Sequence, residues 1–271
     1  AGQQVSEEVS AMKARIKFRK YGVLKFIGHL DVMRYFQKVM RRADIPIAFT
    51  GGFSPHMIMS FASPLGIGLE SDGEYMDIEL TDPIESKEAV RRMNEAGVEG
   101  IEVVSFRQIA EEKKMNGMTI LAAADYLITP KKDILPDAGS AEGSLSHDWK
   151  EQFSDFMEQN EIRVMKQTKR SEKEVDLRPL IYDWEFRDDS IFIRTAAGST
   201  ENLKPDLVMD TFLKYTGAVS EKADSAEAAS GTAQALNAQS FTYRRLEMYA
   251  DSGKDGRRNL VTLESLGGEI H

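Results

Sequence analysis

The sequence predicts an α+β protein made of two tandem units, each with the order strand, helix, strand, strand, helix, strand. Its 271 residues suffice for two modest domains with hydrophobic cores. Runs in which polar and apolar residues alternate indicate strands, and apolar residues three or four apart indicate helices. The order repeats in both halves. It is the ferredoxin-like (βαββαβ) plan with antiparallel sheets, a name that refers to topology alone.

The first unit is expected at residues 12–110, after residues 1–11, which are expected to be a disordered leader. A helix is predicted from Leu30 onward, and Ile45-Pro46 ends it because the residue before a proline avoids the helical conformation. A second helix is predicted at 85–96. The predicted strands are 14–19, 74–81 and 101–106. Extended segments are expected at 46–50 and 57–62, around a turn at 51–52, and at 23–27 after a turn at 21–22.

The second unit is expected at residues 120–250, with the boundary between the units near 107–124. Helices are predicted at 146–159 and at 205–215, where a proline stands near the first turn. Residues 217–240 consist mainly of Ala, Ser, Glu and Gln and are expected to be a low-complexity insertion, and 251–271 a loose polar tail. The predicted strands are 126–129, 163–169, 180–186, 190–195 and 241–249.

The composition excludes several classes of protein. The chain has no cysteine, so it offers no disulfides, thiolate zinc sites, iron–sulfur ligands or cysteine nucleophiles. Only four histidines are present, and we expect neither a metal nor a cofactor. No apolar run approaches the roughly 20 residues that span a bilayer. We therefore expect a cytoplasmic protein that does not associate with membranes.

The charge is distributed unevenly along the chain. The total is −9, from 35 Lys and Arg against 44 Asp and Glu, which by itself disfavours nucleic acid as a partner. Residues 12–50, however, contain ten basic and two acidic side chains, whereas residues 51–100 contain three basic and ten acidic ones. Basic residues of the first predicted helix fall within an arc of about 100°, away from its apolar stripe. The RNA-binding candidates in this segment are Lys25, Arg34, Lys38 and Arg41.

The segment 51–56 (GGFSPH) is rich in glycine and proline. Glycine permits positive φ and close approach of another group, so such a loop can present backbone amides to a phosphate. The segment is neither a Walker A loop nor a dinucleotide-binding fingerprint. Two interpretations stay open: a pair of tight turns between strands, or an RNA contact made by Gly52, Phe53 and Ser54.

The candidates for catalysis are His29, Asp31 and His56. His29 and Asp31 stand at the start of the first predicted helix, where an aspartate commonly serves as a cap. The sharper alternative brings the three side chains together for proton transfer. Two histidines make a weak transition-metal site, so acid–base work or recognition is preferred to metal binding.

In the second half, Lys173 and Arg178 are candidates for binding an anion, with Asp176 holding Arg178 in place. The alternative is a solvated, salt-bridged loop. Of the pair Arg244-Arg245 in the last predicted strand, at most one can face the core. An inward arginine needs a partner, for which Asp176 and Glu247 are the candidates.

Five stretches of the chain carry a resemblance to a known family: 12–22 (MKARIKFRKYG), 24–31 (LKFIGHLD), 52–56 (GFSPH), 64–71 (PLGIGLES) and 173–181 (KEVDLRPLI). In these stretches the chain resembles the radical SAM-linked protein family, a bacterial domain of unknown function. The resemblance extends over nearly all of residues 12–250. Met57 stands where the family usually has proline, and Gly28 where it usually has serine.

The resemblance implies a role beside a radical SAM protein, because family members are encoded next to, or fused to, such a protein, often near genes for an RNase and ribosomal proteins. The iron–sulfur chemistry would then belong to the partner. Our first hypothesis is a non-catalytic accessory protein of a radical SAM enzyme that binds RNA or a ribosome-associated substrate. The alternative is a metal-independent endoribonuclease or RNA-modification subunit that uses His29 and His56. A third hypothesis is a protein-interaction module that docks through the acidic residues 70–99.

Overall fold

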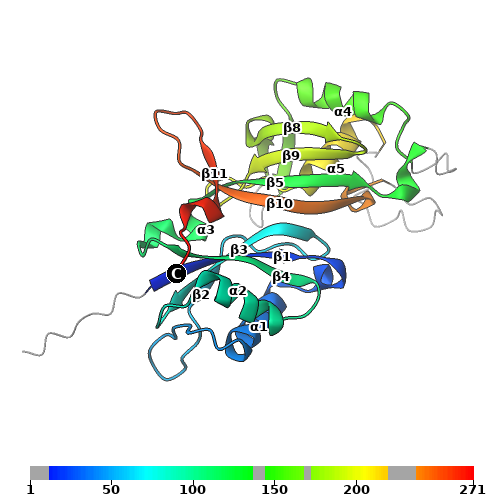
Figure 1. Ribbon diagram of the computed structural model, residues 1–271. Coiled ribbons are helices and arrows are strands. Elements are labelled where there is room, and N and C mark those ends of the chain that lie inside the picture. Colours follow the sequence, from blue (N-terminus) through cyan, green and yellow to red (C-terminus); the bar gives the residue numbers. More distant parts are fainter. Residues whose placement is uncertain (1–11, 137–143, 168–171, 219–235) are drawn as a thin grey trace, which may run out of the picture. The chain divides into compact units, whose positions relative to one another are not determined.

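The computed structural model describes residues 12–136, 144–167, 172–218 and 236–271 (Figure 1). The leader expected at 1–11 and most of the insertion expected at 217–240 lie outside these residues. The described residues form a mixed α+β protein with five α-helices and mostly antiparallel strands, which confirms the predicted class. None of the described helices is long and apolar enough to cross a membrane.

The chain divides into two compact units. The first contains the described residues up to Leu121 together with Glu247–His271, and the second contains Ala122–Leu246. Strand β10 (Phe241–Asp251) begins in the second unit and ends in the first. The C-terminal residues therefore belong to the unit in which the chain begins.

The first unit carries two helices on one face of an antiparallel set of strands (Figure 1). Strand β1 pairs with β3 and β4, and the short β2 pairs with β3. Alternation along β1 buries Phe18 against Phe36 of α1, with the two ring centroids 4.7 Å apart, and burial of each ring stabilises the fold by roughly 2–3 kcal/mol. The elements are β1 (Met12–Lys20), α1 (His29–Arg42), β2 (Met59–Phe61), β3 (Glu70–Leu80), α2 (Ser86–Glu95) and β4 (Ile101–Ile109).

One expectation for this unit was wrong. The stretch expected to be extended at 23–27 is largely a 3-10 helix, η1 (Gly22–Phe26). This stretch is short and lacks a clear period of two, so tertiary contacts decide its conformation. Residues 46–50, also expected to be extended, contribute isolated β-bridges from Ile47 to Leu80 and from Phe49 to Met57.

The tail expected to be loose packs onto the first unit. Strand β11 (Leu260–Thr262) pairs with the end of β10, and η8 (Leu263–Leu266) follows it. Leu263 and Ile270 are buried, and Gln108 of β4 exchanges two backbone hydrogen bonds with Gly268. The tail thus covers part of an edge strand that would otherwise be open to pairing with other chains.

The face of β1 opposite the helices is charged, yet it is covered. The Arg15 guanidinium donates to both carboxylate oxygens of Asp77 at 2.7 and 2.9 Å, and the backbone N–H of Gly117 donates to Asp77 at 2.7 Å. Arg15 also donates to the carbonyl of Leu263. The covering segments include η2 (Lys113–Met115) and α3 (Gly117–Ile120). A buried ion pair with its remaining groups hydrogen-bonded avoids the cost of an uncompensated charge.

A second cluster on the same face joins Lys17 to two carboxylates. The Lys17 ammonium lies 2.7 Å from Glu247 and 3.1 Å from Glu264, and the hydroxyl of Tyr75 donates to Glu247 at 2.6 Å. Burial, followed by the charge of Glu247, raises the pKa of Tyr75, so this hydroxyl remains a neutral donor. The charges on this face hold the C-terminal segments against β1 and β3.

In the second unit, β5 pairs with β9, which pairs with β8, and the first part of β10 lies next to β5. Phe153 and Phe156 of α4 pack against Phe212 of α5 with ring centroids 5.0 and 5.7 Å apart. The elements are β5 (Leu121–Pro130), η3 (Lys132–Ile134), α4 (Trp149–Glu158), β6 (Arg163–Gln167), β7 (Glu172–Asp176), η5 (Arg178–Leu180), β8 (Ile181–Arg187), β9 (Ser190–Ala196), α5 (Pro205–Tyr215) and η7 (Ala238–Ser240).

The second unit differs from the sequence prediction at residues 172–176 and at 238–240, where the end of the expected insertion forms η7. Residues 172–176, expected to belong to a mixed-charge loop, form β7, which pairs with β6 as a separate two-stranded sheet. The inward arginine of the last strand is Arg245, and its guanidinium donates to the hydroxyl of Tyr126 at 3.3 Å. Glu247, one of the partners expected for it, instead binds Lys17 and Tyr75.

Candidate functional site

Helix α1 is amphipathic: one of its sides is apolar and another is basic. Its buried residues are Val32, Phe36, Val39 and Met40. Arg34, Lys38 and Arg41 are exposed, and their spacing of four and three residues places them on one face of the helix. The helix begins at His29, after Gly28, whose carbonyl accepts from the N–H groups of Asp31 and Val32.

Two of these cations are not neutralised. Arg34 donates to Asp31 at 3.3 Å, but both side chains are exposed, and a pair of this kind contributes little. Lys25 lies 3.6 Å from Glu70. In the part of the chain that the structure describes, Lys38 and Arg41 have no ion-pair partner. The basic side of α1 therefore presents positive charge that the protein itself does not use.

The segment 48–58, which we call the hairpin, forms a loop of the first unit next to β2 (Figure 1). Thr50 closes it, because its backbone N–H donates to the carbonyl of His56 at 2.9 Å and its hydroxyl accepts from the N–H of His56 at 3.1 Å. The same hydroxyl lies 3.1 Å from Nδ1 of His56. At the tip, Gly52 has φ of +97° and Phe53 is fully exposed.

The three candidates for catalysis do not form one cluster of hydrogen bonds. The His29 ring packs edge-on against Phe61, with centroids 4.9 Å apart, whereas Asp31 pairs with Arg34 and His56 with Thr50. Among the described residues no hydrogen bond joins the three side chains, and no group of His, Asp and Glu is suited to a metal ion. Asp31 is not the cap residue of α1, since Gly28 occupies that position, but its charge in the first turn is favourable for the helix dipole.

The second-unit candidates lie on and beside β7. Lys173 is exposed on β7, whereas the guanidinium of Arg178 donates to the carbonyl of Ile181 at 3.3 Å. Asp176 does not hold that guanidinium; its carboxylate accepts from the backbone N–H groups of Ile162 and Arg178 at 2.8 and 3.0 Å. Its role is to fix the backbone at the end of the β6–β7 hairpin.

Sequence reasoning missed an exposed apolar patch at one end of the first unit, formed by Val23, Phe26, Leu30 and Ile67. These side chains are between 59% and 79% exposed. The segments that carry them are tied together, because the N–H of Gly68 donates to the carbonyl of Lys25 at 2.8 Å and Ile67 lies over Gly28. The signal in the sequence was Leu30, which precedes Arg34 by one helical turn and so belongs to the exposed face of α1.

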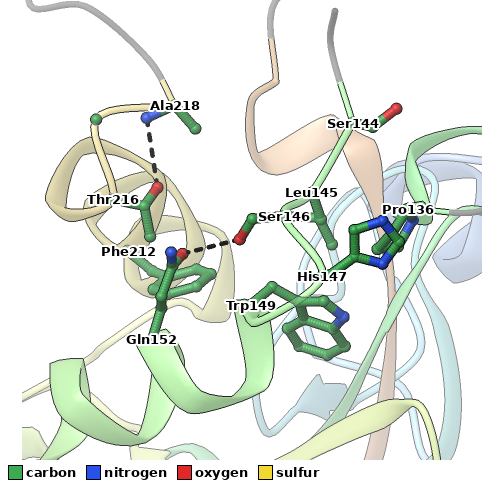
Figure 2. Close-up of a pocket in the computed structure, with 11 residues that line it drawn as sticks. Pro136, Ser144, Leu145, Ser146, His147, Trp149, Gln152, Phe212, Thr216 and Ala218 are labelled. Atoms are coloured by element: carbon green, nitrogen blue, oxygen red, sulfur yellow. Dashed lines mark hydrogen bonds between the residues drawn. The ribbon is translucent and has the colours of Figure 1, made fainter. Parts of the chain in front are cut away.

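The second unit contains a pocket of about 430 Å³ (Figure 2). Trp149 and Phe212 form its apolar wall. Its polar groups bind one another: the Ser146 hydroxyl donates to Gln152 at 3.2 Å, and the hydrogen bond from Ser146 lowers the pKa of nearby Asp148. The exposed His147 stands at the rim. The pocket borders gaps in the described chain and has no buried, unpaired polar group in its described wall.

Comparison with known proteins identifies a family but no activity. Residues 13–205 match the model of a family described as an uncharacterized protein conserved in bacteria (DUF2344). No curated protein matches the chain.

Proposed function

The chain belongs to this family of bacterial proteins, and on that premise we propose that it is a non-catalytic accessory protein that binds RNA and assists a radical SAM enzyme in the cytoplasm. The observation that carries the proposal is the pair of un-neutralised cations, Lys38 and Arg41, beside Arg34 on the exposed side of α1. A polyanion gains most from such a surface, because each neutralised phosphate releases a condensed counterion. The net charge of −9 does not oppose it, since the local field governs binding.

The apolar patch supports the second half of the proposal. Its rim is electrically balanced, since Lys25 lies beside Glu70 and Arg34 beside Asp31. Exposed apolar groups with a polar rim favour a protein partner rather than a nucleic acid. The resemblance names the class of partner, a radical SAM protein, and the absence of cysteine leaves the iron–sulfur chemistry to that partner.

For the fold we propose two tandem ferredoxin-like units. The antiparallel order β4-β1-β3-β2 of the first unit and the order β10-β5-β9-β8 of the second both support it. In each, the first and third strands of the repeat are central. The β6–β7 sheet is then an insertion after the first helix of the second unit.

Filter binding with total bacterial RNA at low salt tests the RNA-binding function. We expect the native protein to retain RNA and the variant Arg34→Glu/Lys38→Glu/Arg41→Glu to lose retention. A matched control, Lys87→Glu/Lys113→Glu/Lys114→Glu, makes the same change in net charge at other exposed positions and should bind as the native protein does. Equal binding by the two variants, or no binding by the native protein, would contradict the proposal.

The same assay separates binding from catalysis. The accessory role predicts that retained RNA stays intact. Cleavage that disappears in His29→Ala or His56→Ala would instead favour the endoribonuclease.

A further inference from the structure

We propose that Phe53 at the tip of the hairpin stacks on an unpaired base, so that the RNA bound by this protein is single-stranded where it meets the hairpin. The inference rests on the proposed function and adds the class of RNA to it. It goes beyond the charge argument, because cations on α1 attract the phosphates of single strands and duplexes alike.

The first argument is that the hairpin is held in place. Three contacts between Thr50 and His56 close it, and below them the N–H of Ile58 donates to the carbonyl of Ala48 at 2.9 Å. Met57 is buried in the core of the first unit and anchors one side. An aromatic ring at such a tip loses little conformational entropy on binding, because the loop that carries it is already ordered.

The second argument is the environment of the ring. Phe53 has no cover, and its neighbours Gly51 and Gly52 carry no side chain. A Cβ added at either glycine would meet no atom within 4 Å, so the space around both glycines is open. Phe53 has two free faces, which is what stacking between bases requires.

The third argument distinguishes a base from a protein pocket as the occupant. The exposed residues of the patch are mostly aliphatic, whereas Phe53 is an aromatic ring flanked by a hydroxyl, Ser54. Aromatic rings next to free cations are the usual elements of single-strand recognition. The free cations of α1 lie close to Phe53 along the chain. Directly after α1 the backbone N–H of Ile45 donates to the carbonyl of Met40, and the segment from Ile47 to Phe53 spans at most about 20 Å.

An unpaired base is required because a duplex does not offer one. In an A-form helix each base is stacked between its neighbours, so an incoming ring would have to unstack a pair first. Alanine substitution of a stacking aromatic usually weakens binding by about 5- to 150-fold. That loss should appear for single-stranded RNA and be absent for duplex RNA.

The experiment measures fluorescence anisotropy with a short labelled RNA, used either single-stranded or annealed to its complement. We expect Phe53→Ala to weaken binding of the single strand about 5- to 150-fold and leave duplex binding unchanged. Phe53→Tyr should restore single-strand affinity. Ile67→Ala, at another exposed apolar position, in the patch, is the control and should leave both affinities unchanged.

The outcomes separate this inference from the proposed function. Lys38→Glu/Arg41→Glu should weaken both forms of RNA. If the native protein binds RNA but Phe53→Ala has no effect, or the same effect on both forms, the stacking role is overturned and RNA binding stands. If the native protein binds neither form, both proposals fail.

Discussion

The two sides of the first unit carry similar charges but put them to different uses. On the covered face of β1, Arg15 is bound to Asp77, and Lys17 to Glu247 and Glu264. On the outer side of α1, Lys38 and Arg41 point to solvent without an ion-pair partner among the described residues. The comparison teaches that the number of cations in a segment does not by itself identify a binding surface. The number of cations that the fold leaves without an ion-pair partner does.

The basic segment 12–50 illustrates the difference. The basic residues of β1 are occupied: Arg19, for example, binds Asp72 and Glu102 at 3.0 and 3.2 Å, and Lys20 donates to the carbonyl of Ile27. The surplus of basic residues read from the sequence therefore overstates what is available to a ligand. The available charge is concentrated on one helix.

The strongest test of the comparison removes a charge from each side. Asp77→Asn leaves Arg15 buried without a counterion, and we expect the free energy of unfolding to fall by roughly 3–5 kcal/mol. Asp31→Asn makes the same change on the exposed side and should alter it by less than about 0.5 kcal/mol. Urea denaturation measures both. Equal losses would show that the two sides do not differ as described.

A smaller effect is expected at the apolar patch. Phe26→Ser/Ile67→Ser should weaken association with the radical SAM partner at least about 30-fold, because exposed apolar residues that anchor an interface contribute about 2 kcal/mol or more. RNA binding should be unchanged, since neither residue lies on the basic side of α1. Co-purification with and without RNase treatment measures the association. Loss of RNA binding together with partner binding would mean that the two surfaces are one.

The smallest effect concerns pH. Burial acts to raise the pKa of Glu264, but the hydrogen bond from Ser105 and the charges of Lys17 and Arg107 outweigh it and lower the pKa. A carboxyl whose pKa is lowered in the folded state stabilises it above the unfolded pKa, and this contribution is lost as pH falls through the folded pKa.

Glu264→Gln should therefore be less stable than the native protein near about pH 7, by at most about 1 kcal/mol. The difference should vanish at acidic pH, where the native Glu264 is protonated. Urea denaturation across the pH range checks this. A difference that persists or grows on acidification would contradict the assigned ion pairs.

Local patterns in the sequence predicted local structure well. Helix α5 has the bounds that its proline and apolar spacing predicted, and β1 and α1 lie where alternation and helical spacing placed them. The pairing of Arg15 with Asp77 could not be predicted, because it joins positions 62 residues apart. The same is true of the tail, whose few apolar residues, such as Leu263 and Ile270, carry no periodic signal.

The candidate site was predicted in part. Charge and spacing identified the basic side of α1, since helical geometry alone places Arg34, Lys38 and Arg41 together. They did not indicate which cations have partners, because those partners come from other strands. The exposure of Phe53 depends on how Thr50 and His56 close the hairpin, which only the three-dimensional structure reveals.

The most direct test of the central claim is the salt dependence of RNA binding by the native protein and by Lys38→Glu/Arg41→Glu. For a single strand, the logarithm of the binding constant falls with the logarithm of salt concentration by about 0.7 per phosphate contact. The account predicts that the variant binds more weakly and that its slope is shallower by about 1.4, the contribution of two contacts. Identical slopes for the two proteins would contradict the claim that these cations meet RNA.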